Sequence, residues 1–163
     1  MKRQMRKIIL VPVLAFFCFS RAAHGFEIQI SGWELKSEFV TPLISDANSE
    51  DLGRAVYKTY ERESPPAVLE IIITEGAGTG NLYVPGSVKT SQGLMPASEY
   101  KILEINGHRA IFENPGFLPS VLAVQAGENL IVNLESSSLA LEELTGIAKE
   151  IFSASMPMPE LDK

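Results

Sequence analysis

The stretch that decides the fold is YKILEINGHRAIFE, residues 100–113. Each half of this stretch is a short strand-like run, and the dipeptide Asn106-Gly107 stands between the two halves. Asn-Gly is the residue pair that best supplies the two positive φ angles of a type I′ turn. The stretch therefore predicts a tight β-hairpin, with strands over 100–105 and 108–113.

Two further pairs of strand-like segments flank this hairpin. On the N-terminal side, AVLEIIIT (67–74) is the most β-branched segment of the chain, and it follows a turn, SPP, at 64–66. This turn favours a strand over 54–62, although the pattern there also fits a helix. On the C-terminal side, two runs (121–125 and 130–134) flank the tetrapeptide AGEN. Three hairpins in series predict an antiparallel sheet.

An amphipathic helix follows the last strand-like run. Apolar side chains recur at spacings of three and four residues from Leu141 to Phe152, and Ser138 is a candidate N-cap. Glu142 and Glu143 lie near the positive end of the helix dipole. Because the helix has a single apolar stripe, we expect an α+β fold: a single antiparallel sheet built from hairpins, with the C-terminal amphipathic helix packed on one face.

The N-terminus determines the expected compartment. Residues 1–7 are basic, residues 8–20 form an apolar run (IILVPVLAFFCFS), and small residues follow, as in a secretory signal peptide. The run is shorter than the roughly 18 to 20 apolar residues of a membrane-spanning helix, and it contains Pro12. We expect export to the periplasm or the extracellular space, with cleavage after Gly25 or, alternatively, after Ala22.

The predicted domain organisation is a signal peptide (1–25), one α+β domain (26–155) and a flexible C-terminal tail (156–163). The length and an apolar content of 45% fit one domain with a single core. An alternation of apolar and polar residues over 26–30 predicts a strand at the start of the domain. The next stretch, 31–48, has no clean period.

The charge of the chain excludes two classes of partner. Residues 1–25 carry five of the fourteen Lys and Arg residues and none of the twenty Asp and Glu residues. From residue 26 onward the net charge is therefore nine minus twenty, or −11. We expect no binding to nucleic acid or to an anionic lipid surface, and no membrane span after processing.

The sequence lacks the patterns of common catalytic and cofactor sites. The only cysteine, Cys18, lies in the leader, so neither thiol catalysis nor thiolate metal sites are expected. The run GAGTG (76–80) lacks the last glycine of a dinucleotide fingerprint, and no helix pattern follows it. His108 is the only plausible general base near neutral pH, and it should lie at a solvated hairpin end. We predict no catalytic residue, no metal and no cofactor.

The segment from 76 to 99 fits the predicted fold least well. It is rich in glycine and proline yet carries large apolar side chains, and long loops of this kind are often functional. We expect a movable cover or contact patch here, next to Trp33, unless the segment is a partly ordered meander that covers a sheet edge. The candidate binding residues are Trp33, Leu82, Tyr83, Val84, Leu94 and Met95.

The order of these features resembles a family pattern. GWE (32–34), LEIIIT (69–74), INGHRA (105–110) and LEELTGIA (141–148) follow one another as in small exported bacterial proteins with a PsbP-like architecture, an antiparallel sheet with helices packed against it. One departure is Ala140, where related helices tend to have Ser or Thr directly before Leu-Glu-Glu. The resemblance implies a non-catalytic accessory or binding protein.

The leading functional hypothesis is an exported, soluble protein that contacts a protein partner or a small apolar ligand and performs no chemistry. The alternative is a hydrolase whose carboxylates are brought together only by folding, which spacing along the chain does not exclude. Two acidic side chains in a deep pocket with perturbed pKa values would favour the hydrolase. A shallow apolar groove would favour binding.

Overall fold

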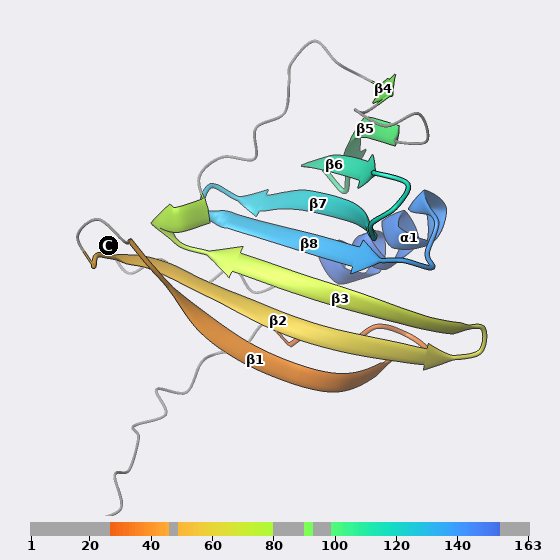
Figure 1. Ribbon diagram of the computed structural model, residues 1–163, viewed down its shortest axis with the longest axis horizontal. Helices are drawn as coiled ribbons and strands as arrows, with labels where there is room; N and C mark the ends of the chain where they lie inside the picture. Colours follow the sequence, from red (N-terminus) through yellow and green to blue (C-terminus); the bar gives the residue numbers. More distant parts are fainter. Residues whose placement is uncertain (1–26, 46–48, 80–89, 93–98, 154–163) are drawn as a thin grey trace, which may run out of the picture.

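The computed structural model describes residues 27–45, 49–79, 90–92 and 99–153. These residues form one antiparallel sheet and one C-terminal helix, so the expected α+β class is confirmed. The sheet has eight strands in the order β1-β2-β3-β8-β7-β6-β5-β4 (Figure 1). The elements are β1 (Glu34–Ile44), β2 (Asp51–Glu63), β3 (Pro66–Glu75), the 3-10 turn η1 (Ala77–Thr79), β4 (Thr90–Gln92), β5 (Glu99–Ile105), β6 (His108–Asn114), β7 (Ser120–Gly127), β8 (Leu130–Ser136) and α1 (Leu141–Ser153).

The three predicted hairpins are confirmed. Asn106 and Gly107 have φ angles of 51° and 85° between β5 and β6, as a type I′ turn requires. The ambiguous segment 54–62 lies within β2, which pairs with β3, and β7 pairs with β8. The pairing of β3 with β8, from Glu70 opposite Glu135 onward, joins the N-terminal strands to the C-terminal ones. This last pairing links residues far apart in sequence, so no local pattern could predict it.

The strand expected at 26–30 is wrong. The described part of this segment lies outside the sheet, although its two isoleucines are buried. The Tyr60 hydroxyl donates a 2.9 Å hydrogen bond to the carbonyl oxygen of Ile28. The backbone N–H and the hydroxyl of Ser31 both donate to Glu150 of α1, at 2.8 and 2.6 Å. An extended segment packed against the core shows the same apolar alternation as a strand, because only one of its sides is buried.

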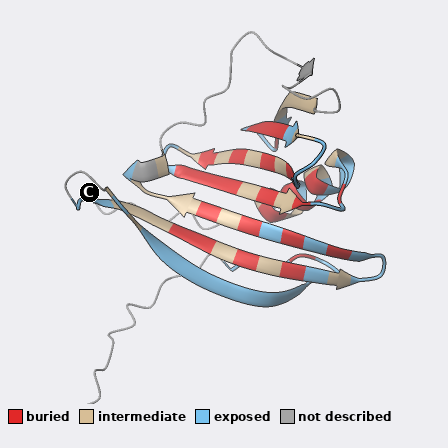
Figure 2. Ribbon diagram, in the orientation of Figure 1, coloured by how far each residue is buried: buried red, intermediate tan, exposed pale blue. Residues whose placement is uncertain are grey.

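The edge strand β1 occupies most of 31–48, where the sequence has no clean period. Among the described residues β1 pairs with β2 alone, and all its residues are exposed except the half-buried Leu43 (Figure 2). Neither face of β1 is covered by another element strongly enough to bury a side chain. Without a buried face, a strand has no need for alternating apolar residues, which explains why the pattern missed it.

The core lies on the face of the sheet that α1 covers. The buried helix residues Leu144, Ile147, Ala148 and Ile151 contact this face, and α1 lies against β5 and β7. In β3, alternate residues from Ala67 to Ile73 are buried, as the two-residue period of a strand requires. Each fully buried aliphatic side chain contributes about 1.5–3 kcal/mol to the free energy of unfolding. The part of the sheet face that α1 covers therefore supplies most of the stability.

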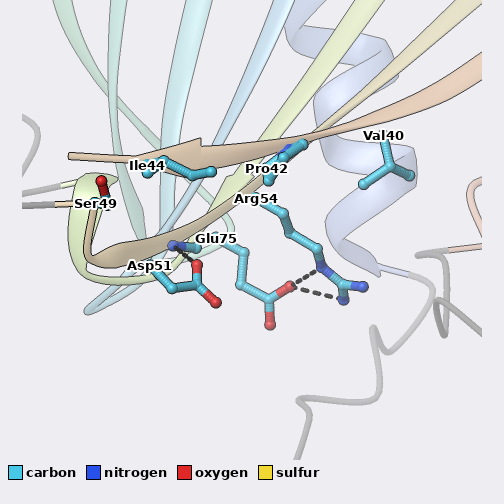
Figure 3. A pocket seen from close by; sticks show the side chains of 9 residues that line it. Val40, Pro42, Ile44, Ser49, Asp51, Arg54 and Glu75 are labelled. Atoms are coloured by element: carbon cyan, nitrogen blue, oxygen red, sulfur yellow. Dashed lines mark hydrogen bonds and ion pairs between the residues drawn. The ribbon is translucent and has the colours of Figure 1, made fainter. Parts of the chain in front are cut away.

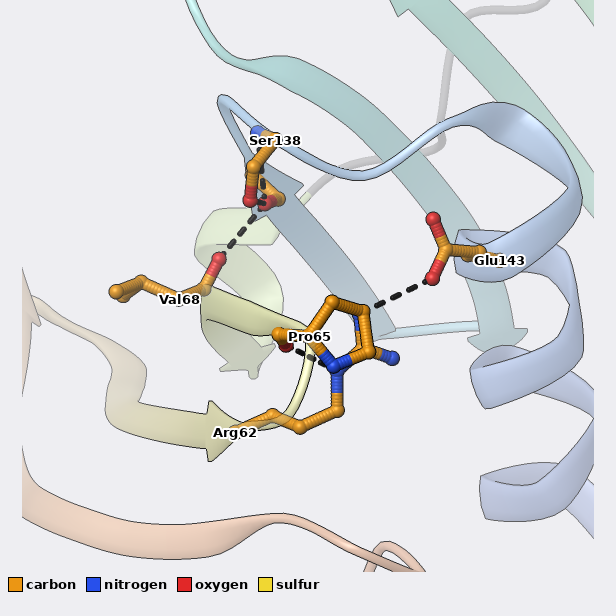
Figure 4. Close-up of polar contacts among 6 residues, drawn as sticks. Arg62, Pro65, Val68, Ser138 and Glu143 are labelled. Carbon is orange, nitrogen blue, oxygen red and sulfur yellow. Dashed lines mark hydrogen bonds and ion pairs between the residues drawn. The ribbon is translucent and has the colours of Figure 1, made fainter.

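The helix begins after Ala140, and Ser138 does not cap it. The carbonyl oxygen of Ala140 accepts the N–H of Leu144 at 3.1 Å, which places Ala140 at the N-cap position. The Ser138 N–H donates instead to the hydroxyl of Ser136, which itself donates to the carbonyl oxygen of Val68 at 2.7 Å (Figure 4). Ser138 thus contacts the end of β8, where Ser136 also binds β3, and does not cap the first turn of the helix.

No helix in the described ranges is long and apolar enough to span a bilayer. The predicted signal peptide and the predicted tail (156–163) lie outside these ranges.

Candidate functional site

A cavity of about 610 Å³, called here the edge pocket, opens where β1, β2 and β3 end (Figure 3). The register places Val40 opposite Val56 and Pro42 opposite Arg54, and Val56 in turn lies opposite Ile73 of the core. The edge pocket is therefore a continuation of the core face, at an end of the sheet that α1 does not cover. Its described lining residues are Val40, Pro42, Ile44, Ser49, Asp51, Gly53, Arg54, Glu75 and Gly76.

One wall of the edge pocket is apolar. Val40, Pro42 and Ile44 stand at alternate positions of β1, and their side chains follow one another along the strand in Figure 3. Val40 is 44% exposed and Ile44 is 56% exposed. Leu35 and Phe39 are two more exposed apolar side chains of the same strand, although Phe39 lies outside the pocket wall and stacks on the ring of Tyr57 at 4.6 Å. This concentration of water-exposed apolar surface on one edge strand is typical of a contact site.

The opposite wall carries an ion pair. Both Nε and Nη2 of Arg54 lie 2.9 Å from the same oxygen of Glu75, Oε2. Nearby, Asp51 Oδ1 accepts the backbone N–H of Gly53 at 2.9 Å. The two side chains of the ion pair are about one-third exposed, so water screens their attraction and the pair contributes little to stability. Its main effect is to position charged groups beside the apolar wall.

Two glycines allow β2 and β3 to meet at the floor of the edge pocket. A Cβ atom on Gly53 would lie 1.9 Å from the carbonyl oxygen of Glu75, and one on Gly76 would lie 2.5 Å from Gly53 Cα. The φ angles are +120° for Gly53 and +116° for Gly76, which residues with side chains rarely adopt. In the sequence, Gly53 directly precedes the predicted strand 54–62 and Gly76 follows the predicted strand 67–74, so no local pattern indicated their close approach.

A second ion pair lies further along the same face. Lys58 Nζ is 2.7 Å from Glu38 Oε2, and the Lys58 side chain is only 4% exposed whereas that of Glu38 is 36% exposed. Burial raises the pKa of the neighbouring Tyr60 to about 12, with a smaller contribution from the charge of Glu38. The phenol therefore stays protonated well into the alkaline range, and it donates a hydrogen bond to the carbonyl oxygen of Ile28.

A pair of carboxylates lies on the other face of the sheet. Glu70 of β3 is directly opposite Glu135 of β8. Burial raises the pKa of Glu135, and the charge of Glu70 raises it further. Glu70 is exposed, so this pair lies on an accessible sheet face and not in a deep pocket. Like charges directly opposite each other in a sheet are destabilising.

Trp33 is the only predicted binding residue among the described ones, and it lies away from the edge pocket. It is half-buried against the core, and the guanidinium of Arg62 lies 4.8 Å from its ring centroid. Arg62 also donates to the carbonyl oxygen of Pro65 and pairs with Glu143 of α1 (Figure 4). Arg62 is eight positions along β2 from Arg54 in the edge pocket, which is about 26 Å in a strand.

The other predicted binding residues lie outside the described ranges. Within the segment 76–99, residues 77–79 form η1 and residues 90–92 form β4, which pairs with β5. β4 lies at the edge of the sheet, which fits the partly ordered meander, one of the two readings of this segment. The residues left as predictions are Leu82, Tyr83, Val84, Leu94 and Met95.

His108 is not at a solvated hairpin end. It is half-buried, and its ring centroid lies 5.1 Å from that of Phe152 in α1. The side-chain amide of Asn106, at the turn itself, donates to the carbonyl oxygen of Lys149 in α1. The hairpin end therefore packs against the C-terminal half of the helix, a contact that only the tertiary fold creates.

Comparison with known proteins adds no further assignment. No family model matches the chain, and neither a curated protein nor a solved structure gives a significant match. Within the described ranges, no group of three or more His, Cys, Asp or Glu side chains is arranged to hold a metal ion. The PsbP-like resemblance remains a prediction. Evidence on function therefore comes from the geometry of the edge pocket.

Proposed function

We propose that this protein is an exported, non-catalytic binding or accessory protein that takes a small apolar ligand in the edge pocket. The observation that carries the proposal is the exposed apolar wall of Val40, Pro42 and Ile44 beside a cavity of about 610 Å³. Burying apolar surface contributes about 25 cal/mol per Å², and cavities of about 300–1,000 Å³ are typical of small-molecule sites. The leader pattern in residues 1–25 supports export.

The polar groups of the edge pocket support binding more than catalysis. Arg54 and Glu75 form an ion pair with each other, and Asp51 accepts a hydrogen bond from the backbone N–H of Gly53. Ser49 is the only described lining residue with a hydroxyl group, and no described histidine lines the pocket beside it to act as its base. Glu70 and Glu135 on the other face do not supply the deep acidic pocket of a hydrolase, because Glu70 is exposed.

Titration with 1-octanol, followed by NMR on the purified protein with labelled methyl groups, tests this proposal. We expect saturable shifts of the Val40 and Ile44 methyl signals, because these side chains form the apolar wall. The variant Val40→Ser should weaken binding severalfold, since it replaces apolar contact surface with a hydroxyl.

Val68→Ser is the matched control. Val68 is 47% exposed, close to the 44% of Val40, but it lies on β3 toward the other end of the sheet. It should leave 1-octanol binding unchanged. The proposal fails if 1-octanol causes no saturable shift, or if Val68→Ser weakens binding as much as Val40→Ser does.

A protein partner is the second candidate, and the exposed edge of β1 favours it. Leu35 and Phe39 are 44% and 56% exposed on β1, which in the part of the chain that the structure describes has a neighbouring strand on one side only. An extended segment of a partner can add to such an edge through backbone hydrogen bonds. A pull-down from envelope extracts would support this candidate if wild type recovers one stoichiometric partner and Phe39→Lys does not.

A further inference from the structure

We infer that the edge pocket prefers ligands that carry a positive charge next to an apolar group, of the class of alkylammonium ions. This inference rests on the proposed function for the apolar part of the ligand and adds the charge of its head group. The evidence is the arrangement of Asp51, Arg54 and Glu75 beside the apolar wall of β1.

The described lining residues have an excess of negative charge. Two carboxylates, Asp51 and Glu75, face one guanidinium, Arg54, which gives a formal charge of −1. Nε and Nη2 of Arg54 both contact the same Glu75 oxygen, so the guanidinium is already neutralised by that carboxylate. The Asp51 carboxylate is exposed, and within the described ranges its hydrogen-bond partner is the uncharged backbone N–H of Gly53. Asp51 therefore supplies the charge that remains for a ligand.

The carboxylates and the apolar wall are placed for one amphiphilic molecule. Figure 3 shows Asp51 and Glu75 beneath the β1 residues Pro42 and Ile44. A ligand chain lying along the apolar wall would bring its head group to these carboxylates. The net charge of −11 from residue 26 onward adds a long-range attraction for cations.

An anionic amphiphile is disfavoured at the same position. A carboxylate ligand would gain little from Arg54, because Glu75 already balances the charge of the guanidinium through two of its donors. It would also lie near Asp51, where two like charges repel each other. A neutral head group would be neither attracted nor repelled by the charge of Asp51. The expected order of affinity is cation, then neutral molecule, then anion.

Three probes with the same eight-carbon chain test this order: n-octylammonium chloride, 1-octanol and sodium octanoate. Each is titrated into the purified protein at pH 7 and constant ionic strength, with the Val40 and Ile44 methyl signals as the readout. Because the pocket is open, octylammonium should bind only about three- to fivefold more tightly than 1-octanol, as for an exposed ion pair. Octanoate should bind less tightly than 1-octanol, and added salt should narrow the differences.

The variant Asp51→Asn removes the charge while the asparagine oxygen can still accept the Gly53 N–H. It should reduce the affinity for octylammonium to that for 1-octanol and leave 1-octanol binding unchanged. Glu104→Gln is the control, because it removes one negative charge from an exposed position on β5, outside the edge pocket. It should leave the preference for octylammonium intact.

Two outcomes would overturn the inference while leaving the proposed function in place. One is octanoate binding as tightly as octylammonium, and the other is Asp51→Asn with an unchanged preference for the cation. If none of the three probes causes a saturable shift, the edge pocket is not a ligand site, and the proposed function fails together with the inference.

Discussion

The two halves of the sheet face that carries the core are built in opposite ways. In the half that α1 covers, the side chains of Ile71, Leu134 and the helix residue Leu144 are fully buried and apolar. At the edge pocket, the same face carries the ion pair of Arg54 with Glu75 and an apolar wall that is open to water. We call these parts the covered half and the open half.

The difference between the halves follows from what covers them. In the covered half, removal of apolar surface from water stabilises the fold, and a charge would lose its hydration. In the open half, charged groups keep part of their hydration and apolar groups gain little from folding. Stability should therefore depend on the covered half, and capacity for binding on the open half. Four predictions test this division, starting with the largest effect.

Truncation of one apolar side chain in each half gives the largest contrast. Leu144→Ala should lower the free energy of unfolding by about 2–5 kcal/mol, because it leaves a cavity in the covered half. Ile44→Ala should cost less than about 0.5 kcal/mol, since Ile44 is 56% exposed. Urea unfolding of both variants measures this. Equal costs would mean that the open half is in fact part of a closed core.

Substitution of Gly53, at the floor of the edge pocket, should destabilise the fold nearly as much as truncation of a core side chain. Gly53→Ala should cost at least about 2 kcal/mol, because the new Cβ would lie 1.9 Å from the carbonyl oxygen of Glu75 at a φ of +120°. Gly146→Ala is the control with the opposite sign. It lies in α1 with no atom within 4 Å of the new Cβ, so it should stabilise by about 0.5–1 kcal/mol. Thermal unfolding of the two variants would show the signs, and a neutral Gly53→Ala would contradict the close approach.

Breaking the ion pair of Lys58 with Glu38, which lies between the two halves, should have an intermediate effect on the free energy of unfolding. Glu38→Gln should cost about 1–2 kcal/mol, because it leaves the ammonium of Lys58, at 4% exposure, without its carboxylate. Lys58→Met should cost less, because the carboxylate left behind is partly hydrated and the methionine stem is apolar. Denaturant unfolding of both single variants and the double variant gives the coupling energy. A larger cost for Lys58→Met would mean that the pair itself holds β1 on the sheet.

The smallest predicted effect lies on the other face of the sheet and depends on pH. The pKa of Glu135 is raised by burial and then by Glu70, so the folded state binds a proton more tightly than the unfolded state. This contribution to stability is present at low pH and is lost as pH rises through the pKa of the folded state. At pH 7, Glu135→Gln should therefore stabilise the protein by about 0.5 kcal/mol.

The advantage of Glu135→Gln should shrink as the pH falls toward the range where glutamate is protonated, because the wild-type side chain is then also neutral. Unfolding of wild type and variant at pH 7 and pH 4 measures this difference. An advantage that is the same at both pH values would assign the effect to packing and not to charge.

Local patterns predicted the elements that have a covered face or a diagnostic turn. Asn106-Gly107 specified a hairpin through its backbone angles, and the apolar stripe of 141–152 specified a helix with one buried face. The same reasoning failed for β1, which has no buried face, and for 26–30, whose alternation reflects packing beside Tyr60 outside the sheet. The candidate site was predicted least well, because the edge pocket joins residues from three strands, and of the predicted set only Trp33 is described.

By itself, the sequence determined the α+β class, the hairpins and the helix, because turn geometry and hydrophobic periodicity act over a few residues. It also determined the acidic balance from residue 26 onward. The tertiary structure alone decided that β3 pairs with β8, that Gly53 meets Gly76, and that Arg54 faces Glu75. Those contacts depend on which strands become neighbours, and this is settled by the burial of the whole core face rather than by any local run of residues.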